Sequence, residues 1–259
     1  MSHSVFVLSN SKGKSYTTDR SWKISISAWS PRTNVSDRYG KDGVSVFGDK
    51  RVGSRTITFN YILNNQNKNS LLETIQNINS VFDPDADHYY VTDTTLNRRM
   101  EVVLTSNDIQ PVEEGTEYFT VRGNMNLRAV APYWETTAVY SSGEVLSNND
   151  TLTIANTSKY DVYPSIKVTC NTNQIDEWRL TNSSNNGNFI ELINTSFTSG
   201  SVFNIDSVSG TITLQGVDSS ASISNGGFIV LKPGDNVLTY TSSSSPVDVN
   251  VKWRNVESY

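Results

Sequence analysis

The sequence predicts a mainly β protein: an N-terminal β domain with one α-helix, followed by a C-terminal β-sandwich. Apolar and polar residues alternate along many short segments, which is the pattern of half-buried strands. Ser, Thr and Asn contribute 36, 26 and 28 of the 259 residues. Ser and Thr suit the solvent faces of such strands, and Asn suits the turns between them. A single segment has the spacing of an amphipathic helix.

The strands follow from the period-two alternation. Trp22–Trp29 has apolar residues at every second position, and Arg55–Tyr61 repeats this with Ile57, Phe59 and Tyr61. The other predicted strands are Arg99–Leu104, Glu117–Leu127, Thr151–Ile154, Ser165–Cys170, Thr211–Leu214 and Val247–Trp253.

The helix is predicted over about residues 70–82. Apolar residues recur there at positions 71, 72, 75, 78 and 82, on one helical face. Asn69 or Ser70 is the expected N-cap, with Glu73 placed to close a capping box on Ser70. Pro84 ends the helix, because the residue before a proline avoids the α conformation.

A domain boundary is expected after residues 131–137, so that residues 1–137 form the first domain and 138–259 the second. Ser-, Asn- and Gly-rich loops separate short strands beyond this point, as in a β-sandwich. Up to Trp134 there are 15 Lys and Arg against 14 Asp and Glu, a net charge of +1; beyond it 6 stand against 12, a net charge of −6. A first half this close to neutral argues against nucleic-acid binding and suits contacts between proteins.

Several classes of protein are excluded by composition. No apolar run approaches the ~18 residues of a membrane-spanning helix, and the first ten residues lack the features of a secretory signal. The single Cys170 excludes an intramolecular disulfide framework and a multi-cysteine zinc site. Because no secretory signal is seen, the Asn-x-Ser/Thr triplets at Asn156, Asn182 and Asn194 are interpreted as accidents of composition.

The densest acidic cluster is Asp83, Asp85, Asp87 and His88. It allows a calcium loop or a solvated loop after the helix. The second is favoured, because the glycine turn and final Glu of an EF-hand are missing. The stretch Tyr39–Gly43 reads as a turn and lacks the pattern of a phosphate-binding loop.

No catalytic arrangement stands out, and the expectation is a protein that is not an enzyme and uses no cofactor or metal. Cys170 lies inside a predicted strand, where a buried structural thiol is usual. A Ser-His-Asp triad would depend on His3 or His88, and no nucleophile elbow is present. Asp176, Glu177 and Glu191 could supply a glycosidase pair, but surface carboxylates are the simpler interpretation.

Two aromatic residues of the second half, Tyr160 and Trp178, are candidates for stacking on a sugar. Packing in the core or anchoring a loop is the favoured interpretation for both.

The features in their order resemble the distal tail proteins of long-tailed, non-contractile bacteriophages, over most of the chain. Those in the first half are the strand with Trp22, the turn Gly40–Gly43, the strand Arg55–Tyr61, the helix Ser70–Phe82 with Asp83-Pro84, the strand at Arg98-Arg99, the stretch Gly115–Leu127 and the close Ala131–Trp134. Those in the second half are Asn156, Tyr163–Ile166, the turn Ile205–Gly210, the hairpin Gly227–Asn236 and the final strand Val249–Arg254. Pro233–Asn236 also reads as a tight turn by its chemistry alone.

The resemblance implies an N-terminal ring-forming domain of sheets plus one helix, and a C-terminal sandwich shaped like a galectin or a carbohydrate-binding module. It implies a virion structural protein of the tail tip, made in the host cytoplasm, whose six N-terminal domains form a ring around the tail channel. The implied partners are other copies of the chain, the tail tube protein and the tail-associated lysin or tip protein, with the tape measure and receptor-binding proteins as further candidates. Membrane insertion and nucleic-acid recognition are not implied.

Two hypotheses of different classes remain. The first is the ring-forming assembly hub, for which the candidate subunit contacts are Lys41, Arg51, Arg55, Arg98 and Arg99. The alternative is a carbohydrate-binding module used for adhesion to the host surface, which would use Tyr160 and Trp178. The chain shows no long inserted carbohydrate module, which counts against direct binding to the cell surface.

Overall fold

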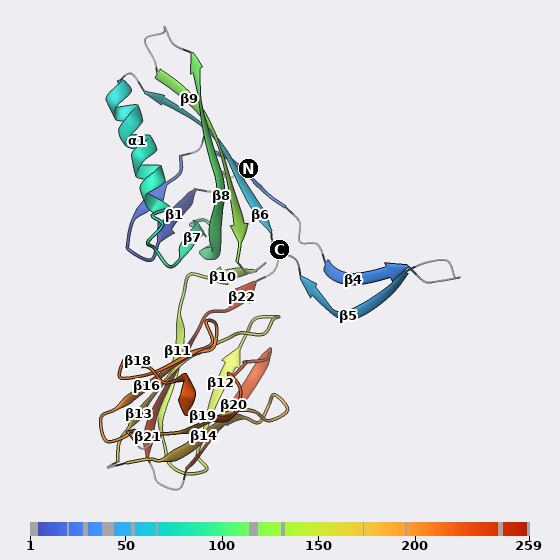
Figure 1. The fold of residues 1–259 in the computed structure, drawn as a ribbon, viewed down its shortest axis with the longest axis vertical. Helices are drawn as coiled ribbons and strands as arrows, with labels where there is room; N and C mark the ends of the chain where they lie inside the picture. The colour runs from blue at the N-terminus through green and yellow to red at the C-terminus, as the bar shows by residue number, and fades with distance from the viewer. Residues whose placement is uncertain are drawn as a thin grey trace. The chain divides into compact units, whose positions relative to one another are not determined.

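A computed structural model shows a mainly β protein with one α-helix, as the sequence predicts (Figure 1). The parts of the chain that it describes are residues 5–19, 21–27, 31–37, 44–52, 55–65, 67–113, 119–130, 133–172, 174–194, 196–242 and 246–257. Of residues 31–37, 44–52, 111–113 and 119 it describes the backbone only. The chain divides into two compact units, Met1–Trp134 and Glu135–Tyr259.

Unit 1 is built on one antiparallel sheet in the strand order β2-β1-β7-β8-β9-β6-β3. The strands are β1 (Phe6–Asn10), β2 (Ser15–Thr17), β3 (Lys23–Ile26), β6 (Thr56–Asn65), β7 (Tyr89–Asp93), β8 (Arg98–Glu113) and β9 (Phe119–Ala129). The long strands β8, β9 and β6 form the centre of the sheet, and each pairs with the next over most of its length.

The helix α1 (Lys68–Val81) packs on one face of this sheet (Figure 1). Leu71, Ile78 and Val81 on its buried side join the core of unit 1. The helix begins earlier than the sequence predicts. Asn67 is the N-cap, and its side chain accepts a hydrogen bond of 2.8 Å from the backbone N–H of Asn69.

The expected capping box on Ser70 is therefore wrong, because Ser70 already lies inside the helix, where its carbonyl accepts from the Thr74 hydroxyl. Phe82 forms the C-cap just before Asp83 and Pro84.

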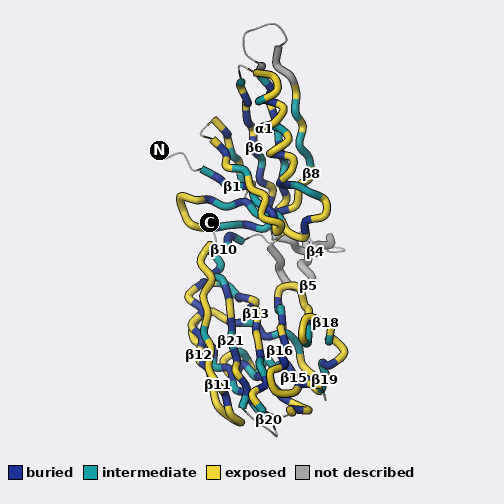
Figure 2. The backbone as a smooth tube through the Cα atoms, turned by 90° about the vertical axis from the view of Figure 1, so that its left-hand side faces the viewer, coloured by how far each residue is buried: buried dark blue, intermediate teal, exposed yellow. Residues whose placement is uncertain are grey.

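The core lies on the helix side of the sheet. In β6, Ile57, Phe59, Tyr61 and Leu63 are buried, while the residues between them are exposed or half-buried (Figure 2). This is the alternation that the sequence predicts for Arg55–Tyr61. The opposite face of β6, β9 and β8 therefore carries the polar set of side chains.

Between β3 and β6 the chain forms a separate two-stranded antiparallel sheet, from β4 (Pro31–Asp37) and β5 (Val44–Val52). Its register places Val35 opposite Val46 and Arg32 opposite Arg51. Among the strands that the structure describes, β4 and β5 pair with each other alone. The predicted turn at Tyr39–Gly43 lies outside the described residues.

Unit 2 is a β-sandwich of two antiparallel sheets with the orders β11-β21-β13-β16-β17-β18 and β12-β20-β14-β15-β19. The strands of the first sheet are β11 (Tyr140–Leu146), β13 (Ser165–Cys170), β16 (Val202–Asp206), β17 (Thr211–Leu214), β18 (Val217–Asp218) and β21 (Val247–Trp253). Those of the second are β12 (Thr151–Asn156), β14 (Glu177–Asn182), β15 (Asn188–Ile193), β19 (Ile223–Gly226) and β20 (Gly234–Ser242). A short 3-10 helix spans Ser220–Ser222, and β22 (Val256–Glu257) pairs with β10 (Trp134–Thr136).

The inner faces of the two sheets enclose one hydrophobic core. Its centre includes Trp178, Phe197, Phe203 and Tyr240, whose ring contacts have centroid separations of 4.9–6.3 Å. Cys170 belongs to this core at the end of β13, buried as its place in a strand predicts.

Candidate functional site

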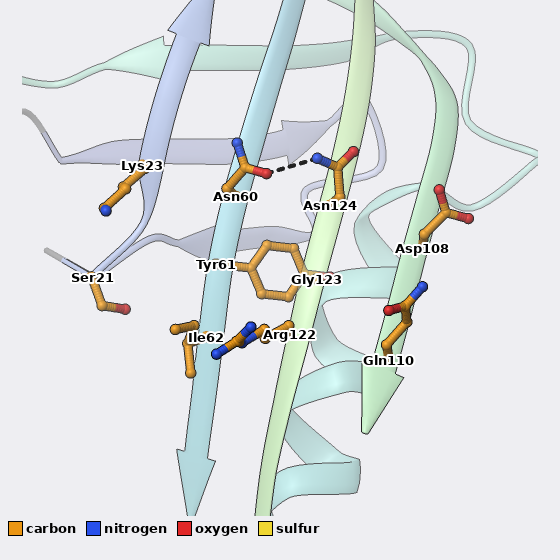
Figure 3. Close-up of a pocket in the computed structure, with 10 residues that line it drawn as sticks. All are labelled: Ser21, Lys23, Asn60, Tyr61, Ile62, Asp108, Gln110, Arg122, Gly123 and Asn124. Carbon is orange, nitrogen blue, oxygen red and sulfur yellow. Dashed lines mark hydrogen bonds between the residues drawn. The ribbon is translucent and has the colours of Figure 1, made fainter. Parts of the chain in front are cut away.

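The open face of unit 1 contains a pocket of about 340 Å³ at the point where β3 stops beside β6 (Figure 3). Its lining comes from β3 and the loop before it, from β6, from β9 and from β8: Ser21, Lys23, Asn60, Tyr61, Ile62, Asp108, Gln110, Arg122, Gly123 and Asn124. Lys23, Arg122 and Asp108 give it mixed charge, and Ile62 is 43% exposed.

Tyr61 is the aromatic residue of this pocket. Its ring stacks on the Trp22 ring, with 4.2 Å between the ring centroids and 14° between the ring planes. The same ring lies over Gly123 of β9, the residue opposite Tyr61 in the β6–β9 register. The hydroxyl donates a 2.9 Å hydrogen bond to Asn107 Oδ1. Burial raises the pKa of Tyr61 to about 12, so the phenol stays neutral at physiological pH.

Next to Tyr61, a ladder of neutral polar side chains crosses the open face. Asn124 Nδ2 donates to Asn60 Oδ1 at 2.7 Å (Figure 3), and Asn126 Nδ2 donates to Asn124 Oδ1 at 2.8 Å. Asn126 also bonds Ser106 on β8 at 3.0 Å and Thr58 on β6 at 2.8 Å. These cross-strand bonds hold the side chains in place before any partner arrives, which lowers the entropy lost on docking. The face is suited to binding a protein surface.

Two of the basic residues predicted as subunit contacts lie in the interior of unit 1. Arg98 is 6% exposed, and its guanidinium donates to Asp93 Oδ2 at 3.1 Å and lies 4.6 Å from the Trp134 ring. Arg55 is 4% exposed. The expectation that they contact another subunit is corrected, because their own unit already covers both side chains.

The other three candidates for subunit contacts are Arg99, Arg51 and Lys41. Arg99 is half-buried, with its guanidinium 4.2 Å from the centre of the Tyr90 ring. Arg51 lies on β5, where only the backbone is described, and Lys41 lies outside the described residues.

The acidic loop after the helix is tied to the first hairpin of unit 1. Lys12 Nζ lies 3.2 Å from Asp83 Oδ2 and 3.9 Å from Asp85 Oδ2. The backbone N–H of Asp85 and then Lys12 hold the pKa of Asp83 below its usual range. Within the described part of the chain, no three His, Cys, Asp or Glu side chains are grouped to hold a metal ion. None of its helices has the length and hydropathy needed to cross a membrane.

Unit 2 has a polar groove of about 420 Å³ on the outer face of the β12-β20-β14-β15-β19 sheet. It is lined by Asn148, Asn149, Glu177, Trp178, Arg179, Glu191, Thr241 and Ser242. The structure thus brings together Glu177 and Glu191, two of the carboxylates considered for a glycosidase. The Arg179 guanidinium lies over the Phe189 ring, 3.6 Å from the ring centre, and its Nη1 is 4.0 Å from Glu191 Oε2. Glu191 Oε1 accepts a hydrogen bond of 2.8 Å from the Ser224 hydroxyl.

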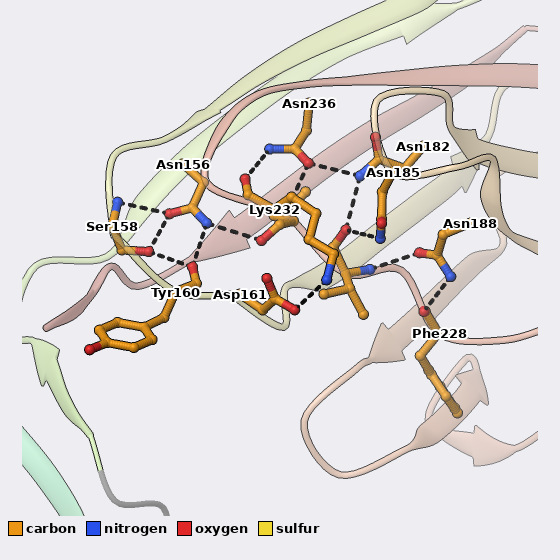
Figure 4. A network of polar contacts seen from close by, with 12 residues as sticks. Asn156, Ser158, Tyr160, Asp161, Asn182, Asn185, Asn188, Phe228, Lys232 and Asn236 are labelled. Atoms are coloured by element: carbon orange, nitrogen blue, oxygen red, sulfur yellow. Dashed lines mark hydrogen bonds and ion pairs between the residues drawn. The ribbon is translucent and has the colours of Figure 1, made fainter. Parts of the chain in front are cut away.

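The two aromatic residues considered for stacking on sugars differ in their burial. Trp178 is only 2% exposed and packs against Phe197, Phe203 and Tyr240. Its ring belongs to the core, as the favoured interpretation of the sequence has it, and it is not placed to stack on a sugar. Tyr160 is half-buried, its carbonyl accepts from Asn156 and Ser158, and its ring points away from that network (Figure 4).

Buried asparagines fix an irregular segment, residues 227–232, against the sandwich (Figure 4). Asn182 donates to the Val230 carbonyl and to Asn236 Oδ1, both at 2.9 Å. Asn156 donates to the Leu231 carbonyl at 3.0 Å. These side-chain amides bind backbone groups of the segment that have no partner strand, so their role is structural.

Asn236 and Asn188 complete the network. Asn236 accepts from the Lys232 N–H at 2.9 Å and donates to its carbonyl at 2.8 Å. Asn188 accepts from the Val230 N–H and donates to the Phe228 carbonyl, at 2.9 and 3.2 Å.

Two family profiles match the chain, one in each unit. The "Phage tail protein RIFT-related domain" matches residues 11–125, and the "Siphovirus-type tail component, C-terminal domain" matches residues 157–256. Together they span most of the sequence. No curated protein sequence matches the chain.

Solved structures share the fold over the whole chain. The Dit protein (gp 19.1) of phage SPP1, described as a paradigm of the hub adsorption apparatus in phages that infect Gram-positive bacteria, is similar with a TM-score of 0.68 at 12% identity, covering 98% of this chain and 100% of that one. A chain of the phage P2 baseplate, in its activated conformation with Ca, has a TM-score of 0.51 at 10% identity, covering 97% of this chain and 98% of that chain. A chain of the same baseplate with Sr has a TM-score of 0.51 at 10% identity, covering 96% of this chain and 97% of that chain.

The proteins that this chain resembles are structural components of phage tails and not enzymes. With both units matched in chain order, the chain belongs to the distal tail proteins of siphoviruses, as a Dit-like structural protein of the tail or baseplate hub.

Proposed function

We propose that this chain forms a ring, with six copies, that joins the tail tube to the tip or tail-associated lysin and serves as the assembly hub for host-attachment parts. The observation that carries the proposal is the likeness to the hub protein SPP1 Dit, across 98% of the chain and in both units. The place of action is the tail tip of the virion, after synthesis in the cytoplasm of the bacterial host.

The open face of unit 1 supports a role in protein assembly. Its polar side chains are held by one another across β6, β9 and β8, and the pocket beside Tyr61 offers a hollow for a partner's side chain. A closed ring needs two different patches on each subunit. Unit 1, with a net charge close to zero, is the part that we assign to these contacts, and Arg99 remains a candidate among them.

The assembly partners follow from the same proposal. They are the tail tube protein on one side of the ring and the tail-associated lysin or tip protein on the other. The tape measure and receptor-binding proteins are the further candidates.

Light scattering on the purified chain tests the ring. We expect a species of about six times the 28.7 kDa chain mass, formed alone or on addition of the tube and tip proteins. A monomer at high concentration, both alone and with these partners, would contradict it.

The groove of unit 2 favours a second candidate function, the binding of a saccharide of the host surface. Arg179, Glu191 and Glu177 line it with hydrogen-bonding groups, and Phe189 and Ser224 hold the first two in place. Pull-down of the full chain by host cell walls tests it. Retention that is lost in Arg179→Ala but kept in Asn204→Ala, a change at an exposed position of β16, would support binding at this groove. No retention of the wild-type chain would contradict it.

A further inference from the structure

The sequence contains the pair Asn-Gly twice, at Asn186–Gly187 and at Asn225–Gly226, both in unit 2. In such a pair the backbone nitrogen of the glycine can attack the side-chain amide of the asparagine, because glycine has no Cβ to hinder the approach. The amide group is then lost as ammonia. Since the two pairs have the same chemistry, the backbone geometry around each one decides which of them reacts in the folded protein.

Asn225 and Gly226 are held in a geometry that favours this attack. They are the last two residues of β19, at the edge of its sheet, and both are exposed to solvent. The Gly226 N–H donates to Asn225 Oδ1 at 2.9 Å. A C=O bond of about 1.23 Å then limits the distance between the Gly226 nitrogen and Asn225 Cγ to at most about 4.1 Å. Attack begins from separations of ~3–3.5 Å, so a small side-chain rotation brings the two atoms together.

The strand pairing of β19 leaves this contact undisturbed. The Gly227 N–H donates to the Phe189 carbonyl at 2.8 Å, so Gly226 and the opposite Ile190 form a non-hydrogen-bonded pair of the β15–β19 ladder. The Gly226 N–H therefore points away from β15, to the side on which the described part of the chain has no further strand. The ladder does not hold the nitrogen, and hydroxide from the solvent can remove its proton.

Asn186 and Gly187 have a geometry that opposes the attack. They are the central residues of the turn between β14 and β15, with φ of 50° and 71°. The Asn188 N–H closes this turn on the Asn185 carbonyl at 2.8 Å. In the left-handed conformation the nitrogen that follows an asparagine stands anti to its Cβ across the Cα–C bond. The side-chain amide of Asn186 therefore cannot meet the Gly187 nitrogen unless the turn opens.

We propose that Asn225 is a site of spontaneous deamidation in the folded protein. The Gly226 nitrogen, deprotonated by hydroxide, forms a bond to Asn225 Cγ, and the side-chain nitrogen leaves as ammonia. Water then opens the resulting five-membered imide at either of its carbonyls, which gives aspartate or isoaspartate. The net reaction takes up one water and releases one ammonia, and it needs no enzyme or cofactor.

The product adds a negative charge beside the groove of unit 2. Asn225 lies opposite Glu191 in the β15–β19 register, and the Ser224 hydroxyl donates to Glu191 Oε1 at 2.8 Å. Opposite residues of an antiparallel pair share one face, with Cβ atoms ~5 Å apart. The new carboxylate therefore repels that of Glu191 and competes with it for Arg179, whose Nη1 is 4.0 Å from Glu191 Oε2. The groove of an aged chain differs in charge from that of a new one, whatever ligand it takes.

Peptide mapping by mass spectrometry tests the proposal on the full chain, aged in mildly alkaline buffer either folded or in denaturant. Labelling with an isoaspartyl methyltransferase identifies the isoaspartate. In the folded chain we expect conversion at Asn225 to be at least about threefold faster than at Asn186, and in denaturant we expect similar rates at the two sites. Equal rates in the folded chain, a faster Asn186, or an Asn225 that converts only in denaturant would overturn the proposal.

Two variants separate Asn225 from the other asparagines of the chain. The more acidic form that accumulates with age on ion exchange should be lost in Asn225→Gln, at an exposed position. It should persist in Asn186→Gly, because glycine accepts the left-handed conformation of that turn. An acidic form that accumulates equally in both variants would overturn the assignment to Asn225.

Discussion

The ring of Tyr61 on β6 lies over the backbone of Gly123 on β9, in the space that any larger residue would need for its Cβ. This close approach explains a glycine in the middle of a central strand, where it otherwise weakens the sheet. It also holds the tyrosine flat against Trp22, on the side of the sheet that faces the core.

Gly123→Ala should destabilise unit 1 by about 1–3 kcal/mol, because the added methyl group forces the Tyr61 ring off Trp22. Denaturant unfolding followed by tryptophan fluorescence measures it. Gly227→Ala is the matched control, since an added methyl group there would meet nothing within 4 Å and the φ of Gly227 is not in the left-handed region. Equal stability of the two variants would contradict the role given to Gly123.

Asn182→Ala should destabilise unit 2 by about 2–4 kcal/mol. The change removes two buried hydrogen bonds of 2.9 Å, to the Val230 carbonyl and to Asn236 Oδ1. The first acceptor then keeps only a long bond of 3.4 Å from Asn185, and the second keeps the Lys232 N–H. Thermal unfolding of the full chain measures it. Asn204→Ala, on an exposed position of β16, should change stability by less than about 0.5 kcal/mol, and a similar loss in both variants would argue against the network.

Arg98→Ala should destabilise unit 1 by about 3–5 kcal/mol, because it leaves the buried carboxylate of Asp93 without its cation. Lys12→Ala breaks the exposed pair with Asp83 and should leave stability unchanged within error. Denaturant unfolding of both variants is the measurement. An Arg98→Ala chain that keeps its stability but loses its oligomeric state would restore Arg98 as a subunit contact.

Stability should fall as pH rises from about 10 to about 12. Burial raises the pKa of Tyr61 and of Tyr240 to about 12, against ~10 in an unfolded chain. A group whose pKa is higher in the folded than in the unfolded state stabilises the fold fully at pH values below its unfolded pKa. This stabilisation is lost as the pH rises through its folded pKa. Tm measured against pH tests this, with tyrosinate absorbance as the second readout. Tyr61→Phe should reduce the alkaline loss, and an equally steep loss in this variant would contradict the assignment.

The regular elements of the fold could be predicted from the sequence because their patterns are local. The alternation at Arg55–Tyr61 places the core face of β6 correctly, and the 3.6-residue spacing finds α1. The start of the helix was missed because Asn67, Asn69 and Ser70 are all able to cap. The local sequence does not show which of them adopts the extended conformation of an N-cap.

The side chains of the candidate sites were harder to predict because their surroundings come from distant parts of the chain. Arg98 carries a charge that suggests exposure, yet Asp93 faces it across the β7–β8 pair and Trp134 covers it from the end of the unit. Trp178 alternates with Arg179 on β14, and a short strand does not show which face meets the other sheet. The close approach of Tyr61 could have been predicted from Gly123, because a glycine inside a strand often marks a place where another group comes close to the backbone.

Electron microscopy of the purified chain in negative stain is the most direct test of the central claim, that this distal tail protein is a ring-forming hub. The account predicts end-on views of a ring with a central hole and six-fold symmetry. Fields of separate monomers at a concentration where the protein is fully folded, unchanged by the tube and tip proteins, would contradict it.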